Sequence, residues 1–185
     1  MNATAGKKLA IGTAALACLF YVAKAQTPAP ATMQKDSTVK NAVQRIPIPN
    51  SDFPISQGVW VPASADTLYL SGTVPPVANP AAPKGSIESY GGTTEAQTVA
   101  TLQRIETILK AQNLSLGDIV MMHAYLVGDP SKENKMDFTG FMAGYTKFFG
   151  TKEQPNKPAR STFQVAGLAG PGILVEIEVI AVRPH

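Results

Sequence analysis

A chain of 185 residues with 44% hydrophobic residues is long enough to form one domain around a buried core. With one cysteine and two histidines, one of them the final residue His185, it has almost nothing for a histidine metal site or a Ser-His-Asp triad. The formal charge of +3 comes from the first 25 residues, which hold three of the 16 basic residues and none of the 13 acidic ones.

Residues 1–25 have the order of a secretory signal peptide. A short basic start precedes an apolar stretch, and the small residues Ala23 and Ala25 follow it. We expect cleavage after Ala25 and a periplasmic or secreted protein. Lipoprotein anchoring at Cys18 is less favoured, because a chain cut there would begin with the apolar LFYVA. An uncleaved anchor is less favoured still, because the apolar run is short for a membrane span.

Cleavage would remove three of the 16 basic residues and none of the 13 acidic ones, so the mature chain would carry no net formal charge. Nucleic-acid binding depends on neutralising phosphates, so a neutral chain argues against a nucleic-acid partner. The mature chain would also lack cysteine, which excludes disulfides and thiolate catalysis. Any chemistry would then depend on carboxylates, hydroxyls, arginine and backbone groups.

The first half of the chain predicts strands. Residues 26–43 are rich in Pro, Ala and polar residues and predict a flexible arm, which leaves residues 44–185 as a single domain. A short strand is predicted at 45–48. Two more are expected within 56–64 and 67–74, joined by a turn, because β-branched and aromatic residues cluster there. The prolines that follow predict a long loop.

The second half predicts two helices and three strands. In the segment 93–113, apolar residues recur every three or four positions, with Thr93 or Thr94 available as the cap. The segment 135–149 carries a second apolar stripe of mainly aromatic residues. A strand is predicted between the two helices at 119–127, and two more follow the second helix at 158–165 and 173–184.

This order predicts an α+β fold, in which two helices pack on one face of a mixed β-sheet. The strand 119–127 is apolar on both sides, and two helices can cover only one face of the sheet. We therefore expect another subunit to cover the other face, which makes the protein a homo-oligomer.

Three charges stand out in the last two strands. Glu176 and Glu178 share one face by the two-residue period, and such a pair is costly in a buried strand without a cation. Arg160 on the preceding strand is the nearest cation if the two strands form a hairpin. Two interpretations stay open: a structural ion pair across the strands, or an arginine that binds a ligand carboxylate while a glutamate handles water or a proton.

The sequence resembles the RidA (YjgF-like) reactive intermediate deaminases. The resemblance lies in LYLSGTVP (68–75), TTEAQTVATLQRIETIL (93–109), LGDIV followed by YL, PARSTFQV (158–165) and LVEIEVIAV. These blocks occur in the family's order and span about residues 45–183. The resemblance implies a chorismate-mutase-like fold and a homotrimer with clefts at the subunit interfaces. It also implies hydrolysis of enamine or imine intermediates to 2-keto acids and ammonia without a cofactor, as in a 2-iminobutanoate/2-iminopropanoate deaminase.

The resemblance also assigns roles to single residues. Arg160 matches the carboxylate-binding arginine of the family, and Glu176 matches its water-handling glutamate, whereas Glu178 has no such role. Ser71 and Gly72 match residues that line the pocket.

Three positions depart from the family pattern. Thr162 stands where cysteine is frequent, and it still offers a hydroxyl. Ile55 replaces the pocket tyrosine, and Met142 stands where asparagine is usual, so the substrate-binding pocket is expected to be more apolar. The alternative to a deaminase is a non-catalytic small-carboxylate-binding or chaperone-like protein of the same fold. RNA cleavage, reported for parts of the family, is disfavoured by the neutral mature charge.

Overall fold

The computed structural model describes residues 42–183. The expected signal peptide and most of the expected flexible arm lie outside these residues. In chain order the main elements are β1 (Gln44–Pro47), β2 (Ser56–Trp60), β3 (Asp66–Thr73), α1 (Thr94–Ala111), β4 (Ile119–Val127), α2 (Phe138–Tyr145), β5 (Ala159–Val165) and β6 (Val175–Arg183). The predicted order of strands and helices is therefore confirmed.

The helix boundaries follow from local caps. The Thr93 side chain accepts a hydrogen bond from the Ala96 amide at 3.1 Å, so Thr93 is the N-cap of α1. The second helix is shorter than the predicted 135–149. It begins after Asp137, whose side chain accepts a hydrogen bond from the Gly140 amide and caps the helix. Lys135 lies outside the helix, because its carbonyl accepts a hydrogen bond from the Asp129 amide in an isolated β-bridge.

All six strands form one sheet in the order β1-β2-β5-β4-β6-β3. The β5 strand runs parallel to β2 and β4, and the other neighbours are antiparallel, so the predicted mixed sheet is confirmed. Strands β2 and β3 follow each other in the chain but do not pair. The expected hairpin between β5 and β6 is wrong, because β4 lies between them and pairs with both.

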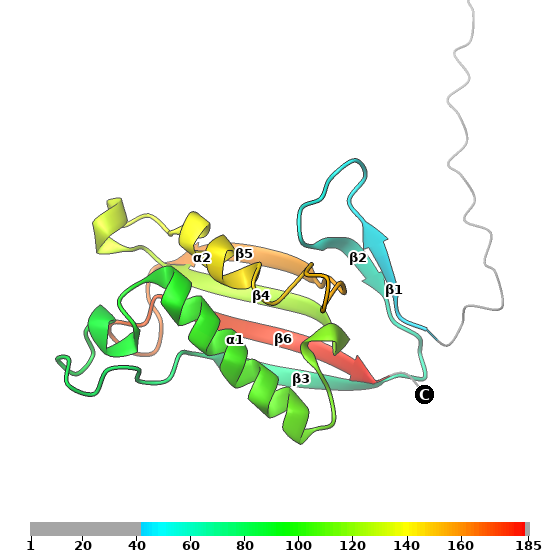
Figure 1. The fold of residues 1–185 in the computed structure, drawn as a ribbon, viewed down its shortest axis with the longest axis horizontal. Coiled ribbons are helices and arrows are strands. Elements are labelled where there is room, and N and C mark those ends of the chain that lie inside the picture. Colours follow the sequence, from blue (N-terminus) through cyan, green and yellow to red (C-terminus); the bar gives the residue numbers. More distant parts are fainter. Residues whose placement is uncertain (1–41, 184–185) are drawn as a thin grey trace, which may run out of the picture. The chain divides into compact units, whose positions relative to one another are not determined.

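Both helices lie over the same face of β5, β4, β6 and β3, as the sequence predicted (Figure 1). Alternate side chains of the central strands turn toward the helices and are buried. The sheet contributes Met122, Ala124, Leu126, Val175, Ile177, Val179 and Ala181 to the core, and the helices contribute Leu102, Ile105, Leu109, Phe141 and Tyr145. The period of two along a strand thus sorts each residue to one side of the sheet.

The two helices approach each other closely at Gly144. A Cβ atom at this position would lie 2.8 Å from the Cβ atom of Thr98 and 2.9 Å from the Glu95 carbonyl oxygen, so no larger residue fits without a shift. The glycine therefore allows α2 to settle over β5, where it covers part of the sheet that α1 does not reach.

The other face of the sheet is open in the single chain. Its exposed aromatic residues include Tyr69, 74% exposed, and Phe163, 47% exposed. The expected second subunit on this face stays a prediction. Within residues 42–183, no helix is long and apolar enough to cross a membrane.

Gln97 links α1 to the loop before β6, and its loss is expected to destabilise the fold. The fully buried side chain donates to the Gly172 carbonyl at 2.9 Å and accepts from the Leu174 amide at 2.8 Å. Gln97→Leu would leave both backbone groups unpaired and should lower the free energy of unfolding by about 2 kcal/mol or more. Urea denaturation measures this change.

The control is Gln103→Leu on the exposed side of the same helix, which should change the free energy of unfolding by no more than about 0.5 kcal/mol. Equal losses in the two variants would show that the Gln97 bridge contributes nothing specific.

Candidate functional site

Arg160 lies on β5 and faces the helices. Its Cα partner on β4 is the fully buried Met122, so its side chain shares the covered face of the sheet. Four aromatic rings surround the guanidinium. The distances from its Cζ atom to the ring centroids are 4.3 Å for Tyr145, 5.0 Å for Phe141, 5.7 Å for Phe53 and 6.0 Å for Phe138. Such ring faces attract a cation without neutralising its charge.

The Arg160 charge has no counter-ion among the residues that the structure describes. Its Nη2 donates to the Met142 sulfur at 3.3 Å, and its Nη1 is buried without a hydrogen-bond partner. No carboxylate between residues 42 and 183 forms a salt bridge with it. Burial lowers the pKa of Arg160, but an arginine remains charged near neutral pH. The result is a half-buried cation with an unused donor.

Thr162 and Ile55 lie beside this cation. Thr162 is two residues along β5 on the same face, and its hydroxyl is also buried without a partner. Ile55 packs against the core, and together with Arg160 it lines a cavity of about 430 Å³. We call Arg160, Thr162 and Ile55, together with the four aromatic rings, the arginine site.

Glu176 lies on the opposite, open face. Its partner on β4 is Tyr125, and its side chain crosses Gly72, where a Cβ atom would overlap the carboxylate. The register of β3 shifts between Leu70 and Thr73, so Ser71 and Gly72 form an irregularity beside Glu176. We call Ser71, Gly72 and Glu176 the glutamate site. A glycine is required at position 72 because the carboxylate occupies the space of a side chain.

The two sites do not meet within one chain. The expected pairing of Arg160 with a glutamate of the last strand is wrong, because β4 separates the strands and the side chains point to opposite faces. Glu178 instead accepts a hydrogen bond from the Tyr125 hydroxyl at 2.9 Å and lies 3.8 Å from His123 Nδ1. The structure therefore excludes the cross-strand ion pair that the sequence left open for Arg160.

The sequence did not reveal the aromatic surroundings of Arg160. Helical spacing alone indicates core positions for Phe138, Phe141 and Tyr145, three aromatic residues of the stripe predicted in 135–149. The same spacing places all three over β5, where they form both core and site. Phe53 comes from the loop before β2 and carried no recognisable signal. Burial raises the pKa of the Tyr145 hydroxyl well above its usual value, and this hydroxyl donates to the Pro54 carbonyl at 2.9 Å.

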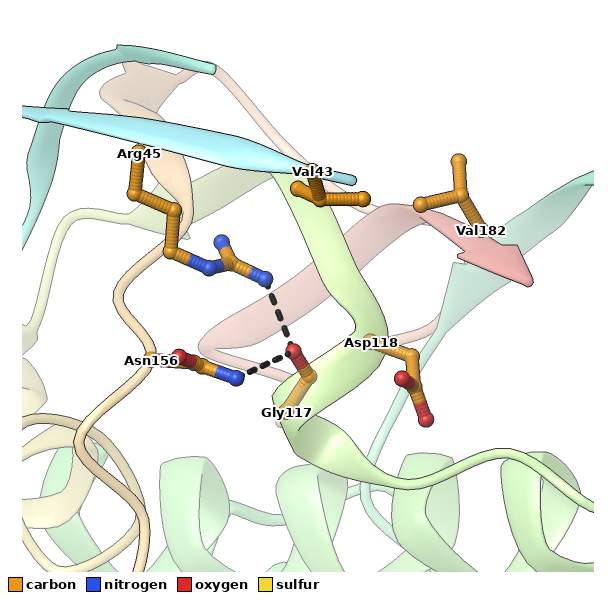
Figure 2. Close-up of a pocket in the computed structure, with 6 residues that line it drawn as sticks. All are labelled: Val43, Arg45, Gly117, Asp118, Asn156 and Val182. Atoms are coloured by element: carbon orange, nitrogen blue, oxygen red, sulfur yellow. Dashed lines mark hydrogen bonds between the residues drawn. The ribbon is translucent and has the colours of Figure 1, made fainter. Parts of the chain in front are cut away.

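A second hollow, of about 350 Å³, lies around Arg45 of β1 (Figure 2). Arg45 donates to the carbonyl oxygens of Gly117, Ile119 and Lys157 at 2.7 to 3.0 Å, and Asn156 also donates to Gly117. Because these hydrogen bonds already engage the guanidinium, Arg45 attaches β1 to the rest of the sheet. This arginine is structural, in contrast to Arg160.

No metal centre is formed by the described part of the chain, in which no group of three or more His, Cys, Asp or Glu side chains could hold an ion. The arginine site and the glutamate site each offer polar groups to a ligand. The first can bind an anion, and the second can accept a proton or orient a water molecule.

Comparison with known proteins places this geometry in context. Residues 50–183 match the family model described as Endoribonuclease L-PSP. A RutC family protein of Sulfurisphaera tokodaii is 35% identical over 129 residues, which cover 69% of this chain and 86% of that protein. A 2-iminobutanoate/2-iminopropanoate deaminase of Salmonella typhimurium is 35% identical over 88 residues. This second match spans 48% of the chain and 62% of the deaminase, less than two thirds of its length.

The fold itself also occurs in solved structures. A conserved Rid family protein, YyfB from Yersinia pestis, aligns with a TM-score of 0.58 at 23% identity, covering 76% of this chain and 98% of that chain. The predicted α+β fold of the chorismate-mutase-like type is thereby confirmed.

Replacing Arg160 by an apolar residue is expected to stabilise the fold. An unpaired, half-buried cation costs desolvation energy, and Met of similar length would remove that cost. Arg160→Met should raise the free energy of unfolding by about 1 kcal/mol or more at fixed protein concentration. Denaturant unfolding measures it.

The matched control is Arg45→Met, which breaks hydrogen bonds to three carbonyls and should lower the free energy of unfolding by about 2 kcal/mol or more. If Arg160→Met were as destabilising as Arg45→Met, then Arg160 would be a structural residue and the arginine site would lose its basis.

Proposed function

The chain belongs to the endoribonuclease L-PSP family, the YjgF/RidA proteins, and from this premise we propose that it hydrolyses reactive imines and enamines of amino acids to 2-keto acids and ammonia. The observation that carries the proposal is the Arg160 guanidinium, half-buried and without a counter-ion among the described residues. The proposed substrates carry a carboxylate that would supply the missing negative charge.

The proposed reaction needs little from the protein. Water adds to the imine carbon, the nitrogen takes up a proton, and the resulting carbinolamine releases ammonia as its carbonyl forms. Arg160 holds the substrate carboxylate and fixes the position of the imine carbon, which contributes by orientation. Glu176 accepts a proton from the attacking water and returns it to the leaving nitrogen. Neither step requires a nucleophilic cysteine or histidine.

The active site is proposed to lie between two copies of the chain. Arg160 and Glu176 are on opposite faces of one sheet, so they cannot act together on one small substrate within a single subunit. A second copy that covers the open face would lie against the glutamate site there, and we propose that this copy presents its own arginine site to that glutamate. This arrangement agrees with the expected homotrimer. Burial of the exposed aromatic residues Tyr69 and Phe163 in a subunit interface would favour association through the open face.

RNA cleavage, which the family model's description names, is less well supported by the surface charges. Lys110, Lys135, Lys147 and Arg183 each pair with a nearby carboxylate. Arg45 is engaged by backbone carbonyls, and Arg160 lies among aromatic rings. These basic side chains therefore do not combine into an exposed basic surface for phosphates. The proposed place of action, the periplasm or the exterior, is supported by the predicted signal peptide alone.

The two glutamates of β6 provide a matched test of the mechanism. An amino-acid oxidase generates 2-iminopropanoate, and the rate of keto-acid release is compared between variants. Glu176→Gln should lower kcat by about 100-fold or more through loss of the general base. Glu178→Gln, on the same face of the strand, should stay within about threefold of the wild type, because the hydrogen bond and ion-pair contact of Glu178 are made to Tyr125 and His123 of its own chain.

Equal losses in the two glutamine variants would contradict the role given to Glu176. Binding of small carboxylates without any turnover by the wild type would favour the non-catalytic alternative.

A complementation experiment tests the shared site. Arg160→Ala and Glu176→Gln subunits are each expected to be inactive, but random mixing at equal ratio should restore about a quarter of wild-type activity if each site takes Arg160 and Glu176 from different copies. Native mass spectrometry confirms subunit exchange in the mixture. If exchange occurs and activity stays at the level of the parents, the two residues do not form a site across subunits.

A further inference from the structure

The Met142 side chain contacts the Arg160 guanidinium. Its sulfur accepts the Nη2 proton at 3.3 Å. Met142 follows Phe141 on α2 and lies three residues before Tyr145, so one turn of the helix delivers the sulfur and two ring faces to the same cation.

A thioether differs from a carboxylate acceptor because it leaves the positive charge of the guanidinium intact. It is a weak and uncharged acceptor, so it directs one N–H group without neutralising the cation. A carboxylate at position 142 would form an ion pair and remove the attraction for an anionic ligand. The four aromatic rings act in the same way as the sulfur, because they too stabilise the cation and leave its charge available.

Two other polar groups of this strand face have no partner in the described chain. With Nη2 engaged by Met142, the unpaired Nη1 is free to meet a ligand. The Thr162 hydroxyl, two residues along the strand on the same face, is also buried without a partner, as are the Thr94 and Thr101 hydroxyls of α1 on another element. Buried polar groups are rarely left unpaired in native proteins, and two on one strand face point to a ligand that satisfies both.

We propose that Met142 is a positioning residue for Arg160, and that the ligand carboxylate is bound by Arg160 Nη1 together with the Thr162 hydroxyl while the Met142 sulfur holds Nη2. This inference rests on the proposed function, because it takes a carboxylate as the ligand. Met142 is a position at which the chain departs from the family pattern. In this arrangement Nη2 of the guanidinium binds the protein and Nη1 binds the substrate.

The test is ligand binding to the full-length protein, with pyruvate and 2-oxobutanoate as unreactive probes in isothermal titration calorimetry. Met142→Leu keeps the volume and removes the acceptor, so Kd should rise about three- to tenfold. Met142→Gln restores an uncharged acceptor and should bring Kd back to within about twofold of the wild type. Thr162→Val should raise Kd about three- to tenfold, and Thr162→Ser should restore it.

Met136→Leu is the control for loss of a methionine, and it should leave Kd unchanged because Met136 lies outside the contacts of the guanidinium. In the turnover assay, Met142→Leu should raise KM and leave kcat within about twofold, since substrate and transition state lose the same contact. A purely structural role of Met142 would instead lower the melting temperature without this separation of KM from kcat. If Met142→Leu does not fold, Met142→Ile replaces it.

The outcomes separate this inference from the proposed function. Unchanged Kd in Met142→Leu and Thr162→Val would overturn the inference and leave the deaminase proposal standing. Keto-acid binding that responds to these variants, in a wild type without turnover, would uphold the inference and overturn the deaminase. A wild type that binds neither keto acid at millimolar concentration would overturn the inference, and absence of turnover in the same preparation would overturn the deaminase.

Discussion

The half-buried cation of Arg160 is the constraint around which the candidate site is organised. Four aromatic rings and one thioether surround it, and none of them cancels its charge. A domain selected for stability alone would neutralise or replace such a group, because desolvation of an unpaired charge opposes folding. The desolvation cost of Arg160 would be offset if a ligand supplied the negative charge. Both the site and the family resemblance therefore favour a substrate with a carboxylate.

The alternation of side chains along each strand determines which residues share a face of the sheet and can bind the same ligand. Neighbouring residues of β5 and β6 alternate between the helix-covered and the open face, and β4 fixes the register of both strands. Arg160 and Thr162 fall on the covered face, whereas Glu176 falls on the open face beside Gly72. The separation of the two sites is therefore a property of the sheet, and an active site that uses both requires a second chain.

The two arginines of the domain show how environment separates structure from function. Arg45 donates to three backbone carbonyls, of which Figure 2 shows that of Gly117, and attaches β1 to the sheet. Arg160 meets a weak thioether acceptor and has a nitrogen without a partner in the described chain. Burial lowers the pKa of both guanidinium groups, so the difference lies in their hydrogen bonds and not in their exposure to water.

The sequence by itself determined the order of the elements, the bounds of β4 and the mixed sheet with its helices on one face, because periodicity and caps are local properties. A family resemblance proposed Arg160, Ser71, Gly72 and Glu176 as site residues. Only the tertiary structure decided that β4 separates β5 from β6, so that Arg160 meets Met142 and aromatic rings instead of a glutamate. Strand order depends on long-range pairing between segments far apart in the chain, and a local pattern cannot report it.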